Sequence, residues 1–156
     1  MRIHGHKVPT ALASLLNADK KLIFEREILE EMSGLKIGLS IPCGLYYLEE
    51  ETKALVKIQK SETKSIYGTE ADLSPAGTKI DADYCLCLGV NHDEEGLCLD
   101  YRGSTDEPAV YLGGWRGQPE EHDVWVRISD NFSEFIDRYQ KLGEQSVPPK
   151  SDRAGG

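Results

Sequence analysis

Two apolar runs with an acidic turn between them decide the fold of this chain: Tyr84-Cys85-Leu86-Cys87-Leu88-Gly89-Val90, His92-Asp93-Glu94-Glu95-Gly96 and Leu97-Cys98-Leu99-Asp100-Tyr101. Successive side chains of a β-strand point to opposite faces of a sheet. The leucines of the first run therefore share one face and its cysteines share the other, and the second run alternates in the same way. The pattern predicts a β-hairpin with half-buried strands.

Two further strands are predicted after this hairpin. Residues 104–108 have the composition of a turn, and residues 109–112 predict a short strand that Gly113-Gly114 breaks. Residues 124–128 predict a final strand that presents valine and isoleucine side chains on one face. The sheet therefore gains two strands in the second half of the chain.

A C-terminal helix has the clearest helical pattern in the sequence. Asn131 stands where a helix N-cap belongs, and Glu134 three residues later completes a capping-box arrangement. An apolar stripe follows at helical spacing and ends near Gly143. Its members are Phe132, Phe135, Ile136 and Tyr139.

The amino-terminal segment predicts two helices. The first covers residues 8–16, where Pro9 is tolerated in a first turn, and the second covers residues 19–32 and ends at Gly34. Apolar residues then alternate over 35–41, which predicts a strand.

The centre of the chain has weaker signals. Pro42 and Gly44 break the preceding strand, residues 45–48 predict another strand, and residues 54–58 fit either a hairpin strand or a helix. Residues 59–80 are rich in Ser, Thr, Gly, Lys and Asp and predict a long loop.

Helices, then hairpin-connected strands, then a closing helix predict an α+β fold. We expect a single domain with a mainly antiparallel sheet of about five to six strands, with helices packed on one side and a C-terminal helix. Residues 1–145 form the expected domain. Residues 146–156 form an expected flexible tail, because the sequence there lacks packing residues.

The charge of the chain restricts its partners. Eighteen Lys and Arg stand against 27 Asp and Glu, which gives a formal net charge of -9. This field repels nucleic acid and anionic lipid, and it attracts basic proteins. We therefore expect a protein partner, with no nucleic acid and no membrane.

Several features predict cytoplasmic residence. Every apolar run is interrupted well before the length of a membrane span, and residues 1–7 lack the apolar stretch of a signal peptide. The four cysteines do not suggest a secreted disulfide framework, so we expect reduced thiols.

A zinc or thiol-dependent site would use Cys85, Cys87, Cys98 and His92. A structural zinc site normally has Cys-x-x-Cys pairs, whereas Cys-x-Cys in an apolar run is better explained by packing under a sheet. The sequence also has no motif of a catalytic nucleophile, a zinc protease or a phosphate-binding loop. We therefore expect no enzyme activity, no metal and no cofactor.

Acidic residues concentrate in the turns between the predicted strands, where they can form a negative binding surface. Tyr101 and Trp115 are candidate aromatic anchors, because such residues are frequent in interface hot spots. The predicted partner-binding residues are Asp93, Glu94, Glu95, Tyr101, Asp106, Glu107, Trp115, Glu120, Glu121 and Asp123.

The second half of the chain resembles the carboxy-terminal half of domains of the SUKH superfamily. The resemblance rests on an apolar strand with an Asp, a short strand with Val and an aromatic residue, and a helix of the form Phe-x-x-Phe-Ile. Val8-Pro9 with Leu12 and Leu15 resembles the family's opening helix. The matching segments are Gly96–Gly103, Glu107–Tyr111, Val124–Ser129 and Asn131–Ile136.

This resemblance implies a sheet-and-helix scaffold that binds other proteins. The family includes many bacterial toxin-immunity proteins, so the leading hypothesis is an immunity protein that neutralises a basic toxin, such as a nuclease, by direct binding. The alternatives are a regulatory scaffold like the yeast glucan-synthesis regulator, and a zinc or thiol-dependent protein. A monomer or a weak homodimer paired through a sheet edge fits either binding function.

Overall fold

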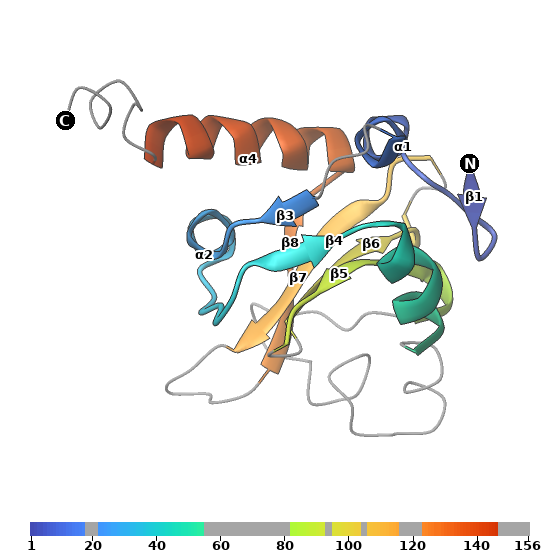
Figure 1. The fold of residues 1–156 in the computed structure, drawn as a ribbon, viewed down its shortest axis with the longest axis horizontal. Coiled ribbons are helices and arrows are strands. Elements are labelled where there is room, and N and C mark those ends of the chain that lie inside the picture. The colour runs from blue at the N-terminus through green and yellow to red at the C-terminus, as the bar shows by residue number, and fades with distance from the viewer. Residues whose placement is uncertain (18–21, 55–81, 93–94, 104–105, 116–122, 147–156) are drawn as a thin grey trace.

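A computed structural model describes residues 1–17, 22–54, 82–92, 95–103, 106–115 and 123–146 (Figure 1). Their elements, in chain order, are β1 (Arg2–Ile3), β2 (His6–Lys7), α1 (Thr10–Asn17), β3 (Leu22–Phe24), α2 (Arg26–Ser33), β4 (Ile41–Cys43), η1 (Tyr47–Glu51), η3 (Ala82–Tyr84), β5 (Cys85–Val90), β6 (Gly96–Asp100), β7 (Ala109–Trp115), β8 (Asp123–Ser129) and α4 (Phe132–Ser146). The predicted loop at 59–80 and residues 147–156 of the predicted tail lie outside the described residues.

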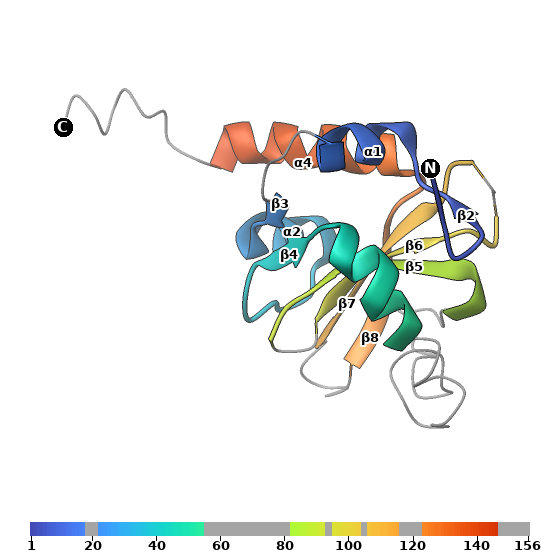
Figure 2. The same ribbon diagram turned by 45° about the vertical axis from the view of Figure 1, so that its right-hand side comes forward.

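The main sheet has six strands in the order β3-β4-β5-β6-β7-β8, and each strand is antiparallel to its neighbours. A separate two-stranded sheet pairs β1 with β2. Helices α1, α2 and α4 lie together on one side of the main sheet (Figures 1 and 2). These findings confirm the predicted α+β single domain with its C-terminal helix.

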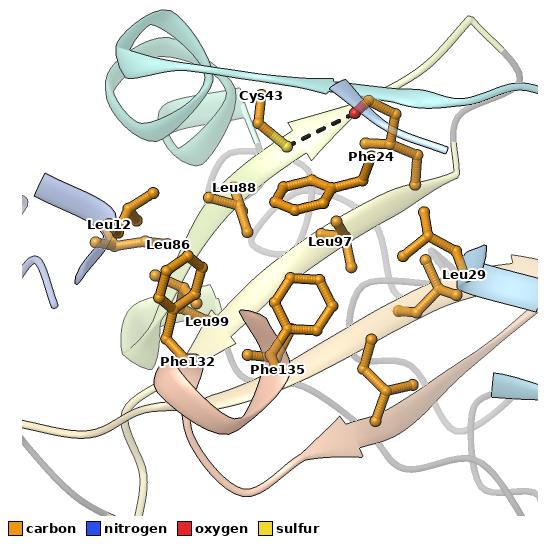
Figure 3. Close-up of a cluster of buried hydrophobic side chains, with 14 of the residues drawn as sticks. Leu12, Phe24, Leu29, Cys43, Leu86, Leu88, Leu97, Leu99, Phe132 and Phe135 are labelled. Atoms are coloured by element: carbon orange, nitrogen blue, oxygen red, sulfur yellow. Dashed lines mark hydrogen bonds between the residues drawn. The ribbon is translucent and has the colours of Figure 1, made fainter. Parts of the chain in front are cut away.

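The main core lies between this face of the sheet and the helices. Leucines of β5 and β6 meet Leu12 of α1, Leu29 of α2, and Phe132 and Phe135 of α4 (Figure 3). Phe24 of β3 packs against Phe135, with 5.2 Å between their ring centroids. The apolar stripe predicted for α4 is therefore on the surface that this helix buries.

The β5–β6 hairpin is confirmed, and a bulge changes its last residues. Cys87 pairs with Cys98, but the register shifts before Gly89, which pairs with Leu97. Because Leu97 belongs to the main core, this shift turns Gly89 to the core face and places Val90 on the opposite face of the sheet.

The opposite face of the sheet is buried as well, which exceeds the predicted half-burial of the hairpin. Cys85, Cys98, Tyr111 and Trp125 form a second apolar cluster there with Ala109. Strand β7 does not stop at Gly113-Gly114, so the break predicted there is wrong. A Cβ atom on Gly113 would lie 2.9 Å from the Trp125 ring, and glycine there makes room for the indole.

The second predicted helix begins too early. Residues 22–24 form β3, the edge strand of the main sheet, and only residues 26–33 form the helix α2. Its end is as predicted, because Gly34 adopts φ 76° and its amide donates to the carbonyl oxygen of Glu30.

The strand predicted at 35–41 is wrong, because only Lys36 forms an isolated bridge before Ile41 and several amides of this segment donate to side chains. The amide of Leu35 donates to Ser33 Oγ and the amide of Ile37 donates to a carboxylate oxygen of Glu30, at 3.0 and 2.8 Å. Strand β4 begins only at Ile41, and it contains the proline that was predicted to end a strand.

The strand predicted at 45–48 is helical. The amide of Tyr47 donates to the carbonyl oxygen of Gly44, and a π-helical turn, η1, follows over Tyr47–Glu51. Within the predicted strand only Leu48 is buried, so its apolar side chains do not line one face of a sheet. Ala54 continues the helix, and residues 55–58 lie outside the described residues.

Helix α4 begins at its predicted cap. Asn131 Oδ1 accepts a hydrogen bond of 2.9 Å from the amide of Glu134. The helix runs past the predicted end near Gly143 to Ser146, and a Cβ on Gly143 would contact Ile28 of α2 at 3.4 Å. The helix therefore continues along the surface of α2.

Candidate partner-binding surface

An open hollow of about 660 Å³ lies on the sheet face opposite the main core. Its floor is a row of three side chains from adjacent strands. Ile23 of β3 pairs with Pro42 of β4, and Val90 of β5 follows Gly89, the partner of Cys43. Ile41 and Cys43 on either side of Pro42 point into the core, so Pro42 points outward.

The walls of this hollow come from three segments. Helix η1, in teal beside β5 in Figure 1, contributes Tyr47 and Glu51, and Tyr46 precedes it. Tyr46 packs edge-on against Tyr47, with 5.4 Å between their ring centroids. The remaining wall residues precede β4 or follow β5, and they are Leu39, Ser40, Asn91 and His92. We refer to these walls and the floor row as the η1 hollow.

Large apolar side chains of the η1 hollow are exposed. Tyr46 is 62% exposed, Ile23 is 48% exposed and Leu39 is 42% exposed. Six large apolar or aromatic residues are exposed in the described part of the chain, and these three gather in one place. An apolar concentration of this kind is typical of a binding surface.

Hydrogen bonds hold the wall formed by Leu39 and Asn91. The Asn91 side-chain amide donates to the carbonyl oxygen of Leu39 at 2.9 Å and to Glu95 Oε1 at 2.8 Å. The Glu95 carboxylate also accepts the amide hydrogen of Gly38 at 2.9 Å. The β5–β6 turn therefore clamps the segment that leads into β4.

The electrostatic setting of the η1 hollow is acidic. Glu51 lines it, and Glu49 and Glu50 are exposed on the same helical turn. Burial, followed by the nearby Cys43 thiol and the Glu51 carboxylate, raises the pKa of Tyr47, so its phenol stays neutral at physiological pH. Among its described lining residues, none is Lys or Arg.

The meander divides the predicted acidic surface between two ends of the sheet. Val90 pairs with Gly96 and Trp115 pairs with Asp123 at one end, whereas Asp100 pairs with Ala109 at the other. Glu95 and Asp123 therefore belong to the first end, while Asp106 and Glu107 belong to the second. The sites Asp93, Glu94, Glu120 and Glu121 lie outside the described residues, and Trp115 and Asp123 are placed only as strand positions.

Two predicted residues at the second end have local partners. The Lys7 ammonium lies 3.5 Å from Asp106 Oδ1. Tyr101 is only 5% exposed, donates a 2.6 Å hydrogen bond to the carbonyl oxygen of Lys7, and stacks on His6 with 4.6 Å between the ring centroids. Its side chain therefore fastens the β1–β2 hairpin to the domain.

All four cysteines are free and buried. Burial and the neighbouring Cys87 raise the pKa of Cys43, while a hydrogen bond with Cys87, followed by burial, raises the pKa of Cys98. These two thiols stay protonated at neutral pH and are poor nucleophiles. The described residues contain no group of three or more side chains that could hold a metal ion.

The η1 hollow was not anticipated from the sequence. The adjacent aromatic residues Tyr46 and Tyr47 lie in the segment 45–48, which was predicted to be a strand. The informative signal is that two neighbouring tyrosines in a strand cannot both face a core. At least one of them must therefore face an outer surface.

No helix among the described residues is long and apolar enough to span a bilayer. Fold and surface together define an α+β domain with an exposed apolar recess that the Glu51 carboxylate borders. The chain belongs to the SMI1 / KNR4 family (SUKH-1), which it matches over residues 7–138. Comparison with curated proteins gives no match, and comparison with solved structures gives none either.

Membership in this family confirms the resemblance to the SUKH superfamily. The match also includes the segment from β3 to η1, where the predicted elements were largely wrong. It supports a domain of the immunity or regulator type that binds partner proteins.

Proposed function

We propose that this chain is a non-catalytic immunity protein that neutralises a basic protein toxin by binding it directly. The observation that carries the proposal is the family match over residues 7–138. The net charge of -9 supports a basic partner, because complementary potentials speed encounter and reject acidic proteins. Binding of this kind needs no cofactor, and the proposal places the protein in the cytoplasm.

A binding role agrees with the chemistry of the described side chains. The Cys43 and Cys98 thiols are buried with raised pKa values, which makes nucleophilic catalysis by either unfavourable. Exposed carboxylates and an apolar recess are instead the features that an interface combines, with an apolar centre and a charged rim. We therefore propose that the domain acts by covering a surface of its partner.

The experiment is a binding titration between this protein and an inactivated form of the basic protein encoded beside its gene. Affinity should fall as salt rises, because screening weakens the charge attraction. A partner that is acidic, or binding that does not change with salt, would contradict the charge argument. Absence of any complex with an encoded neighbour would contradict immunity.

Two charge variants test which of the predicted acidic residues meet the toxin. One variant combines Asp106→Asn with Glu107→Gln, and a second neutralises Asp93, Glu94, Glu120 and Glu121. The matched control neutralises Glu27 and Glu31, which are exposed on α2. Loss of affinity in one of the two variants but not in the control identifies the acidic residues that meet the toxin.

A regulatory scaffold is the second candidate, and membership in a family named after SMI1 and KNR4 favours it equally. Such a scaffold would bind housekeeping proteins of its own cell instead of a toxin. Two observations distinguish these functions: whether a toxin gene lies beside this gene, and whether the protein protects a cell from that toxin. Only an immunity protein restores growth when the neighbouring toxin is expressed.

A further inference from the structure

We propose that the η1 hollow receives a segment of the partner protein that carries an apolar side chain next to a Lys or Arg. The inference rests on the proposed function, because it names the contact by which a basic partner is held. The apolar side chain would lie on the floor formed by Ile23, Pro42 and Val90. The cation would lie beside Glu51.

Apolar side chains of the hollow are open to solvent. Ile23 in the floor and Tyr46 and Leu39 in the walls are between 42% and 62% exposed. Covering these residues removes apolar surface from water, and a tyrosine beside a pocket is a frequent hot spot. The hollow is too open at these residues for a small ligand, which usually buries most of its own surface.

The charge around the hollow favours a cationic segment. Glu51 is the carboxylate among the described lining residues, and Glu49 and Glu50 add negative charge on the same helical turn. The nearest described cation along this helix, Lys53, already lies 3.4 Å from Glu50. A segment with Lys or Arg complements this rim, whereas an acidic segment is repelled.

The hollow is also held in shape before binding. Leu48 of η1 is fully buried in the main core, and Thr52 Oγ1 accepts a 2.8 Å hydrogen bond from the amide of Cys87 in β5. On the opposite wall, Asn91 holds the carbonyl oxygen of Leu39. Binding therefore costs little ordering entropy. The π-helical turn of η1, which supplies Tyr47 and Glu51, is a form often found at functional sites.

The test selects short random peptides, displayed on phage, for binding to the intact chain. Enriched sequences should place Leu, Ile, Phe or Tyr next to Lys or Arg. One enriched peptide is then synthesised and titrated against variants. Enrichment of acidic sequences, or no enrichment at all, would overturn the inference.

Two pairs of variants give the decisive comparison. Tyr46→Ala should lower the affinity for the peptide by about tenfold or more. Tyr84→Ala, which removes a tyrosine that is 49% exposed outside the hollow, should leave the affinity unchanged. Glu51→Gln should also lower the affinity for the peptide, while Glu31→Gln on α2 should not. Equal effects within either pair would overturn the inference. Thermal unfolding checks that each variant is folded.

The same variants separate this inference from the proposed function. If Tyr46→Ala and Glu51→Gln bind the basic toxin as wild type does, the hollow is not the contact, while immunity stands. If no toxin binds but peptides still select the hollow, immunity fails and the hollow stands. If wild type is a dimer that Tyr46→Ala dissociates, the occupant is a second copy and the inference is wrong.

Discussion

The amide nitrogen of Cys87 in β5 donates a 2.8 Å hydrogen bond to the side-chain oxygen of Thr52, and both residues are buried. Strand β4 pairs with β5 only at Cys43 and Gly89, so the edge of β5 beyond that point lacks β4 as a partner. Thr52 supplies an acceptor there. This hydrogen bond helps to join the helical turn that forms one wall of the η1 hollow to the central sheet.

Replacing Thr52 by Val should therefore destabilise the domain. The substitution keeps the shape of the side chain but leaves a buried N–H without this acceptor, which costs about 1–3 kcal/mol of the free energy of unfolding. Urea unfolding measures the change. Thr52→Ser, which retains the hydroxyl, is the control and should cost less than Thr52→Val. Wild-type stability in Thr52→Val would show that this contact does not hold η1.

A second prediction concerns the close approach of β4 to β5. A Cβ on Gly89 would overlap the carbonyl oxygen of Pro42 and lie 2.6 Å from Cys43 Sγ. Backbone cannot yield as a side-chain end can, so Gly89→Ala should cost about 1–3 kcal/mol of stability or more. Gly103→Ala is the matched control, because a Cβ there meets nothing within 4 Å. Equal unfolding midpoints for the two variants would refute the close approach.

The elements that the sequence predicted correctly are those with local patterns. Alternation in β5 and β6, and the cap and stripe from Asn131 to Tyr139, are complete within one short segment. Helix α1 was predicted for the same reason.

The predictions were wrong where backbone amides donate to side chains and not to the carbonyl oxygens of a neighbouring strand. Leu35 and Ile37 alternate as in a strand and are buried, yet their amides bind Ser33 and Glu30. Hydrophobic periodicity reports burial and does not report which acceptor an amide finds. A strand and an ordered connection therefore give the same sequence pattern.

The η1 hollow could not be predicted because its floor depends on register. Ile23, Pro42 and Val90 come from three strands and meet only through the pairing of β3, β4 and β5. The bulge before Gly89 decides that Val90 faces outward. A shift of one residue would point that side chain into the core.

A third prediction follows from the buried thiols and the buried phenol, which lose a proton only at alkaline pH. The pKa values of the Cys43 and Cys98 thiols are raised above 9.0, and burial also raises the pKa of the Tyr101 phenol. In each case the folded state holds its proton more tightly than the unfolded state. The contribution of each group to the free energy of unfolding is then fully present below the pKa of the unfolded state. It is lost as pH rises through the pKa of the folded state.

The free energy of unfolding should therefore fall as pH rises above about 9. Urea unfolding at neutral pH and in steps above this value measures the slope. Cys98→Ala removes one of the groups and should show a shallower fall than wild type. A stability that is constant or rises over the alkaline range would contradict the burial of these groups.

The last prediction separates Glu95 from the other acidic residues expected at a partner interface. Its carboxylate accepts hydrogen bonds from the Gly38 amide and the Asn91 side chain, at 2.9 and 2.8 Å. Glu95→Ala should cost about 1–3 kcal/mol of stability because both donors lose a charged acceptor. Glu31→Ala, at an exposed position on α2, should change stability by less than about 0.5 kcal/mol.

Amide hydrogen exchange gives this prediction a local readout. The Gly38 amide should exchange faster in Glu95→Ala than in wild type, since its acceptor is gone, whereas amides within the β6–β7 ladder should change only as far as global stability falls. Unchanged exchange at Gly38 together with weaker toxin binding would instead place Glu95 in the interface. In that case the wall of the η1 hollow would be held by Asn91 and the carbonyl oxygen of Leu39 alone.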